Sequence, residues 1–132
     1  MIQIAMCIDD DPIVLMLNDL ILKEQSFCGI LIKYDRAESA LEYFDEQSKL
    51  PKEEQELPSL IFLDINMPVM DGWEFLDIFD QLPENKTKDC KIIMHTSSID
   101  PRDIEKAKTY KAVVDYMTKP LNLQSLSKIF QS

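Results

Sequence analysis

The stretch IQIAMCIDDDP, residues 2–12, sets the fold of this chain. Its first seven residues are apolar apart from Gln3, and a nearly unbroken apolar run is typical of a strand buried on both faces of a sheet. Asp11 and Pro12 then favour the start of a helix, because aspartate caps helices well and proline fits the first helical position. Apolar side chains follow at the spacing of an amphipathic helix: Ile13, Met16, Leu17, Leu20 and Ile21.

The same alternation of short apolar runs and longer amphipathic segments continues along the chain. We expect further strands at residues 30–34, 60–63, 91–94 and 113–117, further helices at residues 36–47, 74–82, from 101 and from 122, and polar loops at 48–58 and 85–89. Lys33 interrupts the second apolar run and indicates an edge strand. The alternation predicts a doubly wound α/β fold of the (βα)5 type, with a parallel sheet, right-handed crossovers and helices on both faces.

Length and composition fit one domain spanning residues 1–132, with 45% hydrophobic and 29% charged residues. The sequence has no apolar run of the roughly 20 residues that a membrane span needs, so we expect no membrane partner. The three cysteines, Cys7, Cys28 and Cys90, lack the spacing of a zinc site, and free thiols suit the cytoplasm. We interpret the single histidine, His95, as a strand residue rather than a catalyst.

The net charge of −10 disfavours direct binding to nucleic acid. The charge is uneven, because residues 101–132 hold six basic and three acidic side chains. Arg102, Lys106 and Lys108 fall on one predicted helix. We therefore expect this part of the chain to meet an acidic surface of a protein partner, where opposite charge speeds and orients the encounter.

Polar side chains follow four of the predicted strands at the point where each strand ends. They are Asp9 and Asp10 after the first strand, Asp64 after the third, Thr96 after the fourth and Lys119 after the fifth. Ligands of an open parallel sheet bind beyond the carboxyl ends of its strands. The sequence therefore predicts that three carboxylates, a hydroxyl group and a lysine converge at one edge of the sheet.

Three converging carboxylates indicate a cation or a catalytic role, because two carboxylates ~4 Å apart repel by roughly 4 kcal/mol at an effective dielectric constant of about 20. Carboxylates with room for water and phosphate oxygens suit Mg²⁺. A lysine and a hydroxyl group add donors for a phosphoryl group. The set predicts metal-assisted phosphoryl transfer with an aspartate as nucleophile. Asp71 and Gly72 are interpreted simply as a turn.

Four motifs, in order and each after a predicted strand, resemble the receiver domain of bacterial response regulators. They are IDDDP at residues 8–12, LDINMPVMDG at 63–72, TSS at 96–98 and YMTKP at 116–120. The resemblance covers nearly the whole chain and implies a flavodoxin-like sheet with strand order 2-1-3-4-5. It also implies a stand-alone receiver of the chemotaxis type, which is a signalling phosphoacceptor and not an enzyme.

The resemblance implies that Asp64 accepts a phosphoryl group from a phosphohistidine on a sensor histidine kinase or a histidine phosphotransfer protein. Mg²⁺ would be bound directly by Asp10, Asp64 and the backbone carbonyl of Asn66. Asp9 would act on the ion mainly through a water molecule. A downstream protein would bind through residues 101–131.

The resemblance also implies a switch. Thr96 would hydrogen-bond the phosphoryl group, and Lys119 would pair with Asp64 or its phosphate across a cis Lys119–Pro120 bond. Tyr116 resembles the aromatic residue whose inward or outward position reports the state of the domain. Two side chains would modulate the rate of dephosphorylation: Asn66 and Ser98.

Three other classes of protein share parts of this pattern. A haloacid-dehalogenase-type phosphatase needs an acid two residues after its aspartate, where this chain has Asn66. A flavodoxin-like electron carrier needs a loop rich in hydroxyl groups and glycine after the first strand, where this chain has three acids. A degenerate receiver that only binds a partner would lack some of the phosphorylation residues. The alternative that the chain is a phosphorelay intermediate, which passes phosphate onward, stays open.

The chain also departs from the receiver pattern at residues 110–113, where Gly-Ala is common, and in the long loop at 48–58.

Overall fold

The computed structural model describes residues 2–97 and 99–131. Five parallel strands form one sheet in the order β2-β1-β3-β4-β5, as predicted. The strands are β1 (Ile2–Ile8), β2 (Cys28–Tyr34), β3 (Leu60–Leu63), β4 (Lys91–Thr96) and β5 (Val113–Thr118). The helices are α1 (Pro12–Glu24), α2 (Ala37–Ser48), α3 (Gly72–Phe79), α4 (Glu84–Thr87), α5 (Pro101–Ala107) and α6 (Leu123–Gln131), with a short 3₁₀ turn at Lys52–Glu54. Among the described helices, none is both long and apolar enough to cross a bilayer.

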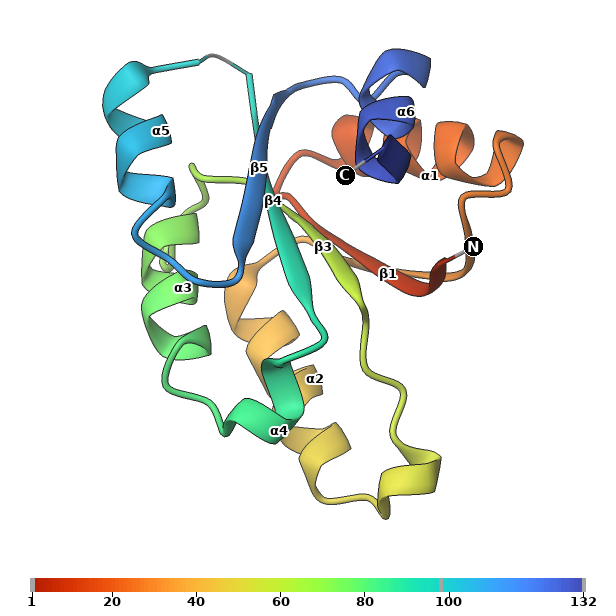
Figure 1. Ribbon diagram of the computed structural model, residues 1–132, viewed down its shortest axis with the longest axis vertical. Helices are drawn as coiled ribbons and strands as arrows, with labels where there is room; N and C mark the ends of the chain where they lie inside the picture. Colours follow the sequence, from red (N-terminus) through yellow and green to blue (C-terminus); the bar gives the residue numbers. More distant parts are fainter. Residues whose placement is uncertain (1, 98, 132) are drawn as a thin grey trace.

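Helices cover both faces of the sheet (Figure 1). On one face α2, α3 and α5 pack on alternate strand residues such as Met6, Ile61 and Met94. On the other face α1 and α6 pack on the residues between them, such as Cys7 and Phe62. The central strands β1, β3 and β4 are therefore buried on both faces, which is why their sequences are almost continuously apolar. Lys33 lies in β2 at the edge of the sheet, as predicted.

Two local predictions need correction. Helix α3 begins at Gly72 rather than at residue 74, because Asp71 and Glu74 form a capping box around its first turn. The Asp71 carboxylate accepts a hydrogen bond from Glu74 N at 2.9 Å, and the Glu74 carboxylate accepts one from Asp71 N at 3.2 Å. The expected loop at residues 85–89 contains the short helix α4.

Helix α1 turns an apolar stripe toward solvent, although the apolar side of an amphipathic helix normally faces the core. Ile13, Met16, Leu17 and Leu20 are 60%, 53%, 42% and 59% exposed. The side chains of α1 that are buried are Leu22 and the polar Asn18, whose Nδ2 lies 3.9 Å from the sulfur of Cys7. Apolar residues occur nearly all round this helix, so their spacing alone did not identify the buried side.

Candidate functional site

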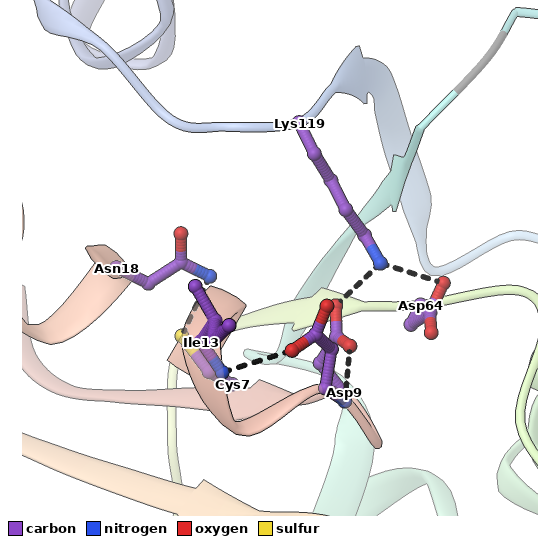
Figure 2. Close-up of polar contacts among 7 residues, drawn as sticks. Cys7, Asp9, Ile13, Asn18, Asp64 and Lys119 are labelled. Carbon is purple, nitrogen blue, oxygen red and sulfur yellow. Dashed lines mark hydrogen bonds and ion pairs between the residues drawn. The ribbon is translucent and has the colours of Figure 1, made fainter. Parts of the chain in front are cut away.

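A buried ion-pair cluster lies at the carboxyl edge of the sheet (Figure 2). Asp9 directly follows β1, Asp64 directly follows β3, and Lys119 follows β5. The Lys119 ammonium nitrogen lies 2.6 Å from Oδ2 of Asp9 and 3.1 Å from Oδ1 of Asp64. Asp9 and Asp64 are only 2% and 4% exposed. Because β1 and β3 are adjacent in the sheet, the two carboxylates are neighbours, and a single lysine contacts both.

The three consecutive acids after β1 have different surroundings. Asp11 caps α1 by accepting a hydrogen bond from Ile13 N at 2.9 Å, as its position before Pro12 predicts. Asp9 accepts a hydrogen bond from Asp11 N at 2.9 Å through the oxygen that does not contact Lys119. Asp10 is exposed. The structure brings one carboxylate oxygen each of Asp9, Asp10 and Asp64 within 4.8 Å of one another, a grouping suited to a metal ion.

Burial and repulsion make the Asp64 carboxylate unusually basic. Burial, followed by the negative charge of Asp9, raises its pKa to about 6, while Lys119 and a hydrogen bond from the backbone of Asn66 act in the opposite direction. For Lys119, burial alone would lower the pKa, but its contacts with Asp9 and Asp64 outweigh burial and raise it. Lys119 therefore stays charged beside a carboxylate that is ionised at neutral pH.

His95 lies in β4 and is 1% exposed, in line with the strand interpretation. Burial, together with the charge of Lys119, lowers its pKa to about 4, so the imidazole is neutral near pH 7. Its ring packs against Phe62 with 6.1 Å between ring centroids.

The loop from Asp64 to Gly72 folds back on its own start. Gly72 N donates to the carbonyl of Ile65 at 2.8 Å, and a Cβ atom at position 72 would lie 2.6 Å from the carbonyl oxygen of Asp64. Glycine is therefore required here by close packing. Within the loop Asn66 and Val69 are exposed, and Val69 adopts a φ of 69°, a strained conformation for a β-branched residue. Sequence reasoning assigned Asp71 and Gly72 to a turn, although the spacing of Asp71 and Glu74 signals a helix cap.

The remaining predicted site residues lie around this cluster. Thr96 is 4% exposed at the end of β4, and its carbonyl accepts a hydrogen bond from Lys119 N at 2.6 Å. The hydroxyl oxygen of Tyr116 is buried, and burial raises the pKa of this group. The Lys119–Pro120 peptide bond is cis, as the resemblance implied. Ser98 lies outside the described residues.

The basic residues of the predicted surface have close partners, five of them with acidic side chains and Lys106 with an uncharged ring. Each of the six basic residues at 101–132 has a partner: Arg102 with Asp100, Lys106 over the ring of Trp73, Lys108 with Glu105, Lys111 with Glu84, Lys119 with Asp9 and Asp64, and Lys128 with Asp115. Some of these acids lie outside the segment whose charge was summed. The net charge of a segment therefore overstated the positive field over this face.

Sheet order and site together define a flavodoxin-like α/β domain with an acidic cluster and a lysine at its carboxyl edge. The family model of the response regulator receiver domain matches residues 5–131 of this chain. The chain therefore belongs to the response regulator receiver family of two-component systems, whose members are signalling domains that accept a phosphoryl group.

Individual relatives agree with this assignment. Two-component response regulator ORR22 of Oryza sativa subsp. japonica is 26% identical over 127 residues, covering 96% of this chain and 16% of that protein. ARR2 of Arabidopsis thaliana is 30% identical over 127 residues, covering 96% of this chain and 17% of that protein. The chain thus spans less than a fifth of these relatives.

Solved structures extend the comparison over whole chains. A two-component response regulator from Cytophaga hutchinsonii has a TM-score of 0.88 and 31% identity, with 98% of this chain and 95% of that chain covered. The Mn²⁺-bound form of response regulator Rcp1 has a TM-score of 0.72 and 27% identity, with 98% and 89% covered. Chemotaxis protein CheY4 of Vibrio cholerae, at 23% identity and a TM-score of 0.71, shares the fold.

Substitution Gly72→Ala should destabilise the domain by roughly 1–3 kcal/mol, because the new methyl group would press on the Asp64 backbone. Urea unfolding measures the effect. Gly29→Ala is the matched control, since its Cβ would meet the carbonyl oxygen of Gln3 at 3.1 Å, a milder contact. Equal free energies of unfolding for the two variants would contradict the importance of the 2.6 Å approach.

The stability of the metal-free protein should fall as pH rises from about 4.5 to 7.5. Asp64 releases its proton near pH 6 in the folded state but near 3.8 when unfolded, so the folded state binds the extra proton in between. The free energy of unfolding should drop by about 2 kcal/mol relative to Asp64→Asn. Urea unfolding of both proteins in EDTA at the two pH values tests this, and a pH-independent difference would refute the raised pKa.

Proposed function

We propose that Asp64 is the phosphoacceptor and receives a phosphoryl group from a phosphohistidine on a sensor histidine kinase or a histidine phosphotransfer protein. In the transfer, a bond forms between an Asp64 oxygen and phosphorus, and the phosphorus–nitrogen bond to the donor imidazole breaks. The observation that carries the proposal is the buried Asp64 carboxylate, held 3.1 Å from Lys119 and beside two further acids. Its raised pKa makes the ionised carboxylate a stronger nucleophile than an exposed aspartate.

The donor set fits Mg²⁺, with Asp10, Asp64 and the backbone carbonyl of Asn66 as direct ligands. Three carboxylates and one lysine leave a net charge of −2 in the cluster, which matches one divalent cation. Asp9 engages Lys119 and Asp11 N with its two oxygens, which supports a role through water rather than direct binding. When bound, the ion neutralises the carboxylates against an incoming anionic phosphoryl group. Rcp1, similar in fold, binds Mn²⁺.

Lys119 and Thr96 then act on the acquired phosphoryl group. The ammonium group of Lys119 already contacts Asp64 and can follow the new negative charge. Thr96 supplies a hydroxyl group at the end of the neighbouring strand, β4. Thr118 of β5 pairs with Thr96 across the sheet, and Tyr116, two residues earlier in β5, would pass a change in the position of Thr96 to the surface. Asn66 and Ser98 modulate the lifetime of the phosphorylated state. The absence of an acid at position 66 disfavours a phosphatase.

The output is binding of a downstream protein through residues 101–131, with residues 1–132 acting as one receiver unit. Passing the phosphoryl group to a further histidine is the alternative output. Because the segment's basic residues are locally paired, its partner need not be strongly acidic. The three cysteines, Cys7, Cys28 and Cys90, are free, which supports a cytoplasmic location.

The exposed stripe on α1 supports a protein as the phosphoryl donor. The helix starts directly after the acidic cluster, so a partner lying on Ile13, Met16, Leu17 and Leu20 would reach Asp64 with an adjacent side chain. A small-molecule donor needs no such surface.

Acetyl phosphate with Mg²⁺ should add one phosphoryl group to the parent protein, and Asp64→Asn should abolish the addition. Intact mass measures it. Asp35→Asn is the matched control, because Asp35 follows β2 at the same edge of the sheet but is exposed. Labelling should also need the metal, so EDTA should prevent it. If Asp64→Asn is labelled as fast as the parent, the acceptor is a different residue.

Met16→Gln combined with Leu20→Gln should slow phosphoryl transfer from a phosphorylated histidine phosphotransfer protein about tenfold, since two apolar contacts are lost. Labelling by acetyl phosphate should not change. Val114→Gln, at a site 52% exposed on the far strand β5, is the control. Equal slowing of both donors would mean that the α1 substitutions damage the acceptor site instead of a docking surface.

A further inference from the structure

The loop that follows the acceptor aspartate has a strained tip at Val69. The φ angle of Val69 is 69°, and Met70 N donates a hydrogen bond to the carbonyl of Pro68 at 2.8 Å. A hydrogen bond that spans three residues around a positive φ defines a γ-turn of the rare, strained kind. A β-branched residue fits such a turn poorly, because its side chain crowds its own backbone there.

The Val69 side chain contributes little to folding that would offset this strain. It is 88% exposed, the highest value among the exposed large apolar side chains of the described residues. Glycine, asparagine or aspartate would form the same turn with less strain, since these residues adopt a positive φ more readily. The fold does not need a valine here, and a strained residue that the fold does not need points to a contact with another molecule.

The tip is held in place near Asp64. Gly72 N donates to the carbonyl of Ile65 at 2.8 Å, which closes the loop at its base, and Gly72 packs against the carbonyl of Asp64. Between these ends Met67 is only 8% exposed and anchors the loop in the core that α2, α3 and α5 cover. Val69 is therefore presented to solvent from a loop whose position relative to the acceptor is fixed.

We propose that Val69 contacts the protein that donates the phosphoryl group and helps to select that donor. This role rests on the proposed function of Asp64. A donor imidazole that reaches Asp64 must bring its own surface over the segments that start at Asp9 and Asp64. Each segment presents an exposed apolar side chain there, since Ile13 is 60% exposed and Val69 is 88% exposed. Because the turn already fixes Val69, a donor can cover it without first ordering the loop, which lowers the cost of binding.

The test compares two phosphoryl donors for the parent and for Val69→Asn. The protein donor is the fastest of a panel of phosphorylated histidine kinases and histidine phosphotransfer domains, and the small donor is acetyl phosphate with Mg²⁺. Asparagine keeps the turn but removes the apolar contact. The rate of transfer from the protein donor, divided by the rate with acetyl phosphate, should therefore fall about fivefold. The midpoint of urea unfolding should rise, because the backbone strain is relieved.

Val114→Asn is the matched control, because Val114 is 52% exposed near the start of β5, at the opposite edge of the sheet from Asp64. An unchanged ratio of rates, an equal fall in the control, or a lower urea midpoint for Val69→Asn would overturn the role of Val69 alone. A parent that acetyl phosphate labels but that accepts nothing from any protein donor would overturn the protein donor and, with it, this role. Labelling of Asp64→Asn at the parent's rate would overturn the proposed function as well.

Discussion

The contact of Lys119 with Asp9 and Asp64 is the interaction on which the rest of this domain depends. Two buried carboxylates repel each other, and burial penalises the charge of each, so the arrangement needs a cation. Lys119 supplies one positive charge and leaves Asp64 with a pKa of about 6. The fold therefore holds the Asp64 carboxylate against a repulsion that a divalent cation would reduce.

The strand order makes this contact possible. Asp9 and Asp64 are neighbours only because β1 and β3 are hydrogen-bonded in parallel, and Lys119 arrives from β5, two strands from β3. The long lysine side chain crosses β4 to reach both acids. Gly72 allows the start of α3 to lie close against the Asp64 backbone, so the sheet and the loop after β3 both hold Asp64 in place.

Much of this arrangement was predictable from the sequence. Apolar runs buried on both faces differ clearly from amphipathic helices, and polar residues at the strand ends then mark the site without further information. The side of α1 that packs on the sheet was not predictable, because Leu15, Leu17 and Leu22 are chemically equivalent until the shape of the core selects among them. Burial of Asn18 in place of an apolar neighbour depends on the space beside Cys7, which a one-dimensional pattern does not contain.

Charge was the least predictable property, for a related physical reason. A sum over residues 101–132 treats the segment as isolated, but Arg102 pairs with Asp100 and Lys111 pairs with Glu84, two acids that lie outside it. At physiological ionic strength, fields between exposed charges fade over about 8 Å, so such near partners decide what a visiting molecule senses. Lys106 differs from both, because it lies over the uncharged ring of Trp73, where it joins α5 to α3 and keeps its charge.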